Sequence, residues 1–211
     1  MKQRMFNMDL CRVISMLGIL TLHYNLSGVL DIVEKGSSAY WIAWLLEIIA
    51  LCSVNIFAMM SGYLGWEKHV LRSKRLVELL LTALIECALI TVVFLLAAPT
   101  VFESNKEMLA GLFPPLKGRL WYIVCFVPLF LFQPFINKLL LELTERQERN
   151  LCIVSLVLLG CIPSLIKVDL FHINNGYSFI WLAVCYSMGH YLRRAEKTIN
   201  LRNALKIYAG G

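Results

Sequence analysis

The chain has 211 residues, a formal net charge of +6, 59% hydrophobic residues and only 16% charged residues. A typical soluble domain has roughly 45–50% apolar and roughly 25% charged residues. A soluble protein of this size could not bury so much apolar surface, so the composition excludes the soluble, disordered and coiled-coil classes. We therefore expect a membrane protein with the lipid bilayer as its main partner, and no nucleic-acid partner, because no nucleic-acid-binding module accompanies the positive charge.

Six apolar stretches are long enough, at about 20 residues, to form transmembrane helices. Four of them contain no charged residue, and the other two contain only glutamates. Short polar loops separate them. The predicted segments are residues 13–30, 36–66, 76–102, 120–137, 150–166 and 170–192. The sequence therefore predicts an all-α fold, a polytopic membrane helix bundle with about six transmembrane helices.

The positions of the basic residues predict the orientation. With the N-terminus inside, fourteen lysines and arginines fall on the cytoplasmic side and five fall in the outer loops, and Arg12 lies at the inner end of the first segment. Cytoplasmic loops of membrane proteins collect Lys and Arg. We therefore predict that both termini are cytoplasmic.

The first segment carries two polar side chains with a regular spacing. His23 follows Arg12 by eleven residues. On an α-helix this spacing is about three turns, so both side chains lie on one face, roughly 16 Å apart along the axis. One interpretation is that Arg12 extends to the interface and His23 bonds to a neighbouring helix. The other is functional, because ionisable groups within a membrane are costly and a neutral histidine can act as a general base.

Polar residues in the next segments also allow two interpretations. Asn55 and Ser61 lie in an apolar run and are typical of helix packing, although they could also line a pocket. Glu47 and Glu86 could pair with His23 or line a water-filled cavity. The spacing does not choose between these possibilities.

The first cytoplasmic loop contains Arg72-Ser-Lys-Arg75. Residues three apart share a helix face, so Arg72 and Arg75 could hold one phosphate group from two sides. The simpler interpretation is the ordinary positive charge of a cytoplasmic loop. Seven cysteines occur without metal-ligand spacing, and we expect no metal and no bound cofactor.

Together these residues resemble the acyltransferase-3 family of membrane acyltransferases. Four patterns occur in the family's order. They are Asp9-Leu10-Cys11-Arg12 leading through ten residues to His23, Ser53-Val54-Asn55-Ile56-Phe57 followed by Ser61-Gly62-Tyr63, Arg72-x-x-Arg75, and Leu120-Trp121-Tyr122 followed by Pro134-Phe135. A weaker similarity runs from Tyr177 to Arg193. The patterns span residues 9 to 193. The resemblance implies a single transmembrane domain over residues 1–211 and a multi-pass protein of the cell inner (plasma) membrane.

The resemblance implies a reaction, its substrates and its residues. An acyl group, usually acetyl, would pass from cytoplasmic acyl-CoA, the co-substrate, to a hydroxyl of an envelope carbohydrate or lipid-linked glycan. His23 would be the catalytic base or a transient acyl carrier, and Arg12 would also belong to the catalytic residues. Arg12, Arg72 and Arg75 would bind acyl-CoA. A possible pocket would be lined by Asn55, Ser61, Tyr63, Trp121 and Tyr122.

Two other functions remain open from the sequence. Arg12, His23, Glu47 and Glu86 could form the polar pathway of a transporter or channel subunit. Alternatively, the chain could be an inactive member of the family with a structural role, because it contains fewer helices than family members usually have and we expect it to be truncated at its C-terminus.

Overall fold

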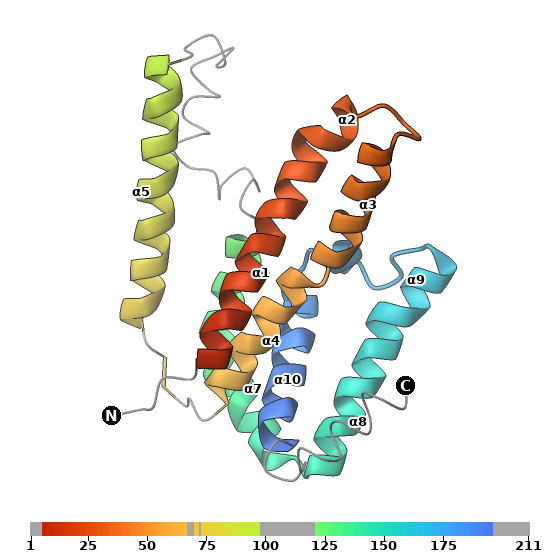
Figure 1. Cartoon of the computed structure of the whole chain (residues 1–211). Coiled ribbons are helices and arrows are strands. Elements are labelled where there is room, and N and C mark those ends of the chain that lie inside the picture. The colour runs from red at the N-terminus through yellow and green to blue at the C-terminus, as the bar shows by residue number, and fades with distance from the viewer. Residues whose placement is uncertain (1–5, 67–69, 72, 98–120, 196–211) are drawn as a thin grey trace. The chain divides into compact units, whose positions relative to one another are not determined.

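The computed structural model describes residues 6–66, 70–71, 73–97 and 121–195. Within these ranges the chain forms helices and connecting turns, with no strand, as the sequence predicted. Its helices are α1 (Phe6–Tyr24), α2 (Leu30–Ile32), α3 (Ser38–Ala50), α4 (Ser53–Gly65), α5 (Ser73–Ala97), α7 (Trp121–Glu142), α8 (Glu145–Leu156), α9 (Ile162–Ile166) and α10 (Phe179–Ala195) (Figure 1). The π-helical turns Asn25–Val29 and Val157–Cys161 continue α1 and α8, respectively.

The chain divides into two compact units. The first consists of Met1–Glu67, Leu140–Val157 and Ala183–Gly211, and the second of Lys68–Leu139 and Leu158–Leu182. Each unit is described by itself below. The expectation of a single domain over residues 1–211 stays a prediction.

In the first unit, α1 and α3 pack against each other in opposite directions. The Asn25 side chain donates a 3.0 Å hydrogen bond to the carbonyl oxygen of Ala43, near the end of α1. Seven residues earlier, a Cβ atom on Gly18 would lie 3.8 Å from the Cα of Ala50 and only 2.0 Å from the hydroxyl of Ser53. Residues later in α1 thus face residues earlier in α3. Gly18 lets the two helices approach, as small residues do in membrane bundles.

Helix α3 begins at a side-chain cap and is followed almost directly by α4. The hydroxyl of Ser37 accepts a 3.2 Å hydrogen bond from the backbone N–H of Tyr40, which satisfies one of the unpaired donors at the helix start. A short break at Leu51 and Cys52 separates α3 from α4. The predicted segment 36–66 is therefore helical along almost its whole length, in two consecutive helices.

Helices α4 and α10 make a very close contact in the first unit. A Cβ atom on Gly62 would lie 1.9 Å from the carbonyl oxygen of Tyr186, and one on Gly189 would lie 1.8 Å from that of Met59. No side chain of any size fits at either point. The two glycines therefore set the separation of α4 and α10, because only glycine lets the backbones touch.

The second unit contains α5, most of α7 and the turn that precedes α10. In this turn the carboxylate of Asp169 accepts hydrogen bonds from the backbone N–H groups of Ile173 and Asn174, at 2.9 and 2.6 Å. The predicted segment 170–192 was therefore wrong at its start, because residues 170–178 form this Asp169-bound turn and the helix begins only at Phe179.

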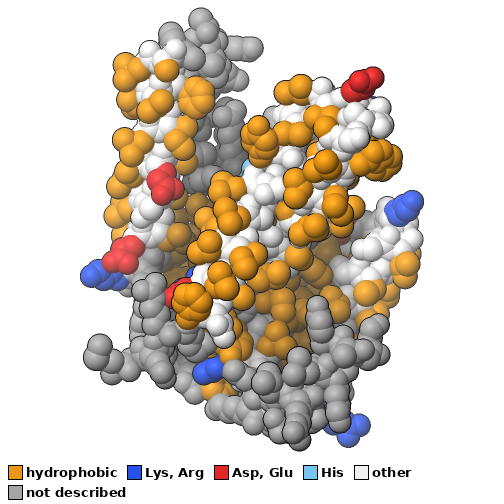
Figure 2. All heavy atoms as spheres, viewed as in Figure 1, with side chains coloured by type: hydrophobic (Ala, Val, Ile, Leu, Met, Phe, Trp, Pro, Cys, Tyr) orange, Lys and Arg blue, Asp and Glu red, His pale blue; other side chains and the backbone are white. Residues whose placement is uncertain are grey.

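Four helical stretches are long and apolar enough to cross a membrane within the described ranges. They are Ser38–Gly65, Leu76–Ala97, Trp121–Glu142 and Glu145–Ile166. Their outward faces are rich in exposed aliphatic and aromatic side chains, and Figure 2 shows such side chains over the visible faces of α1, α3 and α5. The chain is thus an all-α protein with several membrane-spanning helices, whereas the count of six and the orientation stay predictions.

Candidate functional site

Helix α1 carries the two residues on which the predicted catalytic site depends. It is continuous from Phe6 to Tyr24, so the eleven-residue spacing does place Arg12 and His23 on one helix face. His23 lies in the last turn of α1, and its side chain is exposed. No hydrogen bond or ion pair joins the His23 ring to another residue that the structure describes. The role of His23 in catalysis thus stays a prediction.

Arg12 is half-exposed and pairs within its own helix. Its Nη1 lies 3.4 Å from Oδ1 of Asp9, one turn earlier. The side chain of Arg12 is 49% exposed, so this ion pair is weak and a phosphate group could replace it. Arg12 thus carries a positive charge on the same face as His23, about 16 Å away along the axis.

Glu47 does not pair with His23. The Glu47 side chain lies on the buried face of α3, and the residue is only 4% exposed. Its Oε2 atom is buried without a hydrogen-bond partner among the described residues. Because His23 is exposed on α1, the interpretation that these two side chains form a pair is wrong. Glu86 is exposed on α5 in the second unit, and its pairing with His23 stays untested.

Two of the predicted pocket residues make packing contacts around α4. The Ser61 hydroxyl donates to the carbonyl oxygen of Phe57, at 3.1 Å within the same helix. Oδ1 of Asn55 accepts a 3.8 Å contact from the thiol of Cys185 on α10. Asn55 therefore contributes to the packing of α4 against α10.

Tyr63 contacts an arginine that the sequence analysis gave no role. Nη1 of Arg193, in the last turn of α10, donates a 3.0 Å hydrogen bond to the Tyr63 hydroxyl. The Arg193 guanidinium carbon also lies 5.0 Å from the centre of the Tyr63 ring, which is cation–π geometry. The ends of α4 and α10 thus hold a cation against an aromatic ring.

The remaining predicted site residues lie in the second unit or outside the described residues. Arg72 and the side chain of Arg75 lie outside the described residues. Trp121 and Tyr122 begin α7 and pack edge to face, with ring centres 5.8 Å apart. The Trp121 ring also packs against Tyr177, at 4.6 Å. Trp121 and Tyr122 thus form an aromatic cluster, in keeping with residues at a membrane interface.

The structure reveals a buried charge cluster that sequence reasoning missed. Glu148 on α8 and His190 on α10 are both completely buried, and Oε1 of Glu148 lies 2.6 Å from Nδ1 of His190. The other oxygen, Oε2, accepts a 2.9 Å hydrogen bond from Arg194. A carboxylate can only accept, so Nδ1 of His190 carries the proton in this contact. Nε2 of His190 is buried without a hydrogen-bond partner among the described residues. The ring centres of His190 and Trp66 lie 6.0 Å apart.

Two local signals were present in the sequence for this cluster. Thr144 and Gln147 form a capping box, with Thr144 accepting from the Gln147 N–H, and this box places Glu148 in the first turn of α8. His190 and Arg194 are four residues apart on α10, so they share a helix face. The ring of His190 is enclosed by protein, which favours a structural role for this histidine.

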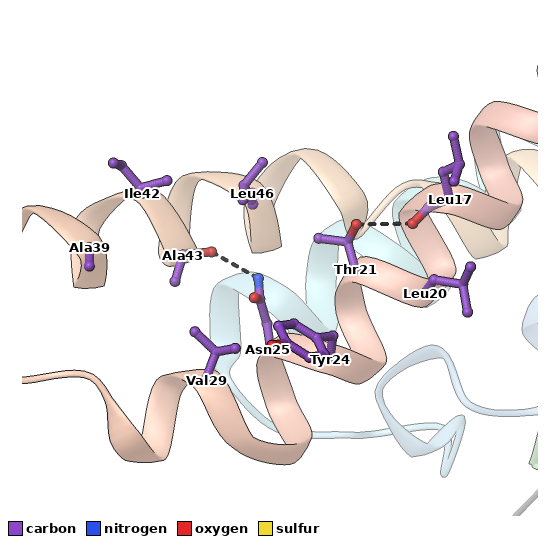
Figure 3. A pocket seen from close by; sticks show the side chains of 10 residues that line it. All are labelled: Leu17, Leu20, Thr21, Tyr24, Asn25, Val29, Ala39, Ile42, Ala43 and Leu46. Carbon is purple, nitrogen blue, oxygen red and sulfur yellow. Dashed lines mark hydrogen bonds between the residues drawn. The ribbon is translucent and has the colours of Figure 1, made fainter.

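An apolar groove of about 670 Å³ runs between α1 and α3 in the first unit. Figure 3 shows that Asn25 and Thr21, its two most polar side chains, are bonded to the carbonyls of Ala43 and Leu17. No charged residue lines the groove, so its chemistry suits hydrocarbon and not a phosphate group. None of the predicted site residues lines it.

Comparisons with known proteins identify the family. The sequence matches the acyltransferase domain that defines the acyltransferase-3 family, over residues 5–210. No curated protein and no solved structure matches the chain significantly. The match covers almost the whole chain and includes all four patterns on which the resemblance rested. The chain therefore belongs to the acyltransferase-3 family of membrane acyltransferases.

Proposed function

We propose that this protein transfers an acetyl group from acetyl-CoA to a hydroxyl of an envelope carbohydrate or a lipid-linked glycan. The observation that carries the proposal is the family match over residues 5–210, which supports membrane acyl transfer in general. The donor, the acceptor and the location in the cell inner membrane are inferred from the resemblance of the four sequence patterns.

The proposed reaction exchanges one acyl bond for another. The oxygen of the acceptor hydroxyl attacks the thioester carbonyl carbon, and the bond from that carbon to the CoA sulfur breaks. His23 removes the proton from the attacking hydroxyl and returns it to the departing thiolate, so no proton is gained or lost overall. In a variant of this scheme, His23 first accepts the acyl group and then passes it to the hydroxyl.

The surroundings of His23 support this role. A general base must offer a ring nitrogen to its substrate, and the exposed His23 ring has no bond to another described residue. Arg12 supplies a positive charge on the same face at a distance that suits a long donor such as acyl-CoA. Arg72 and Arg75 would complete the binding of the CoA phosphates.

The acceptor part of the proposal rests on polar and aromatic residues. Asn55, Ser61, Tyr63, Trp121 and Tyr122 are the candidates for lining the path of the donor or the acceptor. Aromatic rings and amide groups suit a sugar, because they offer flat apolar faces together with hydrogen-bonding groups.

Labelled acetyl-CoA tests the proposal. Membranes that contain the protein, and matched membranes without it, are incubated with acetyl-CoA that carries the label in the acetyl group. Label in the carbohydrate or lipid-linked glycan fraction only when the protein is present supports the proposal. If the protein moves a solute across the membrane and neither binds nor consumes acetyl-CoA, it is a transporter instead and the proposal fails.

A further inference from the structure

The apolar groove in the first unit is built from two matching stripes of side chains. On each helix the stripe follows the three- and four-residue spacing that keeps side chains on one face. Its lining includes Leu17, Leu20 and Tyr24 of α1 and Ala39, Ile42 and Leu46 of α3. The groove lies at the surface of the protein, because Leu20, Tyr24 and Ile42 are each more than half exposed.

The most polar side chains of the groove are already bonded within the protein. The Thr21 hydroxyl donates to the carbonyl oxygen of Leu17 at 2.9 Å, and the Asn25 amide donates to that of Ala43 at 3.0 Å (Figure 3). No charged residue lines the groove, so a phosphate group would have no ionic partner there. Its volume of about 670 Å³ is within the range of about 300–1,000 Å³ for ligand sites. The groove therefore suits a long hydrocarbon chain.

The groove lies next to His23 on α1. His23 follows Leu20 by three residues and directly precedes Tyr24, and both neighbours line the groove. On a helix the step from Leu20 to His23 is a rotation of about 60° and a rise of roughly 4.5 Å. Leu20 and Tyr24 thus form the rim between the groove and His23. The lining ends at Val29, roughly 9 Å beyond His23 along the axis, which is about the length of a sugar phosphate.

Of the participants in the proposed reaction, one carries a long hydrocarbon chain. An acetyl group is too small to fill the groove, the phosphates of CoA need a charged lining, and a free carbohydrate is polar throughout. The hydrocarbon anchor of a lipid-linked glycan remains. The predicted orientation agrees with this choice, because the lining of α1 runs from Leu17 to Val29, in the part of the helix away from the predicted cytoplasmic N-terminus.

We propose that the groove between α1 and α3 binds the hydrocarbon anchor of a lipid-linked glycan and so keeps its headgroup beside His23. This inference rests on the proposed function and chooses between its two acceptors. Bulk lipid is as apolar as the groove, so the hydrophobic effect alone gives the anchor no preference for it. The preference has to come from packing against the side chains of the groove, and a substitution that fills the groove should remove it.

Photo-cross-linking in phospholipid nanodiscs tests the binding of the anchor. The purified full chain is embedded with a trace of long-chain polyprenyl phosphate that carries a photoreactive group on its hydrocarbon chain, and the cross-linked residues are mapped by mass spectrometry. Cross-links should concentrate on the residues of α1 and α3 that line the groove. A phospholipid with the same photoreactive group should label the exposed apolar faces evenly. Equal labelling of the groove by both probes would identify bulk lipid as its occupant and would overturn the inference.

Two substitutions at similarly exposed positions test the groove itself. Ile42 lines the groove and is 58% exposed, whereas Ile48 lies on α3 outside the groove and is 61% exposed. We expect Ile42→Trp to lower cross-linking of the groove by polyprenyl phosphate about tenfold, because it overpacks the site, and Ile48→Trp to leave it unchanged. Ala39→Phe, also at an exposed position of the groove, should act like Ile42→Trp. Equal unfolding temperatures of the variants would confirm that they are folded.

Transfer of labelled acetyl groups separates failure of this inference from failure of the proposed function. In native membranes Ile42→Trp should lower the label in lipid-linked glycan, and Ile48→Trp should not. If the wild type transfers acetyl groups but Ile42→Trp changes neither cross-linking nor transfer, the inference fails and the proposed function stands. If the wild type transfers no acetyl group, the proposed function fails. The groove is then no acceptor site, and this inference fails with it.

Discussion

Glu148 and His190 form a 2.6 Å hydrogen bond between two completely buried side chains, 42 residues apart in the sequence. The carboxylate also binds Arg194, so one buried anion holds two groups of α10. Removing one partner from such a cluster leaves the others unpaired in a medium of low dielectric constant. The cluster therefore joins α8 to α10 more firmly than an exposed ion pair could.

Removing the Glu148 carboxylate should destabilise the first unit. Breaking a buried ion pair typically costs about 3–5 kcal/mol, so we expect Glu148→Ala to lower the thermal unfolding temperature clearly in detergent. Cys152 lies one turn further along α8 and is only 6% exposed, which makes it a native reporter. Its reaction with a maleimide should become faster in Glu148→Ala. Equal unfolding temperatures and labelling rates in Glu148→Ala and Glu142→Ala would show that the cluster is not stabilising.

The contact between α4 and α10 predicts a strong effect of one methyl group. A Cβ at position 189 would lie 1.8 Å from the carbonyl oxygen of Met59, so Gly189→Ala has to push the helices apart. We expect a loss of stability of about 1–3 kcal/mol or more, the range for overpacked sites. Gly28→Ala is the control, because no atom lies within 4 Å of the added Cβ there. Size-exclusion chromatography after stepwise heating measures the fraction of each variant that remains folded. Equal fractions for Gly189→Ala and Gly28→Ala would contradict the close contact.

For Glu47 we expect a substitution that does not lower the stability, unlike the two substitutions described above. Its Oε2 atom is buried without a hydrogen-bond partner among the described residues, so the carboxyl group makes no bond there that a substitution could remove. A charged group in this position is costly, whereas a neutral amide of the same shape is less so. We expect Glu47→Gln to be at least as stable as the wild type in thermal unfolding. A large loss of stability would indicate that the carboxylate has a charged partner.

The orientation can be tested with a reporter at each end. With both termini predicted in the cytoplasm, a reporter that is active only in the cytoplasm should work when fused after Gly211, and also before Met1. The same reporter inserted next to Lys35, in a predicted outer loop, should be inactive. Activity at Lys35 would contradict the predicted orientation.

The sequence predicted the features that depend on composition and on local periodicity. The shortage of charge indicated membrane helices, and the helical spacing of Arg12 and His23 holds because α1 is continuous through both residues. The turn after α9 was misjudged because residues 170–178 contain no Asp, Glu, Lys or Arg, and the prediction rested on this lack of charge. In the structure the Asp169 carboxylate instead binds the backbone of Ile173 and Asn174.

The contacts between distant residues could not be predicted in this way. Periodicity shows that His190 and Arg194 share a face of α10, but not that Glu148 lies opposite them. The same limit applies to Tyr63 and Arg193, which are 130 residues apart. A single sequence does not show which helices are neighbours. Polar residues that face another helix therefore cannot be distinguished, from the sequence, from charged residues of loops or of the membrane interface.

Replacement of His23 tests the central claim most directly. Membranes containing the wild type, His23→Ala or Tyr24→Phe are compared for transfer of labelled acetyl groups from acetyl-CoA to carbohydrate, with equal insertion verified by immunoblotting. Because the His23 ring is exposed and has no bond to another described residue, His23→Ala should insert and fold normally while transfer is abolished. Tyr24→Phe, at the neighbouring exposed position, should retain transfer. Normal transfer by His23→Ala would contradict the role of this histidine in catalysis.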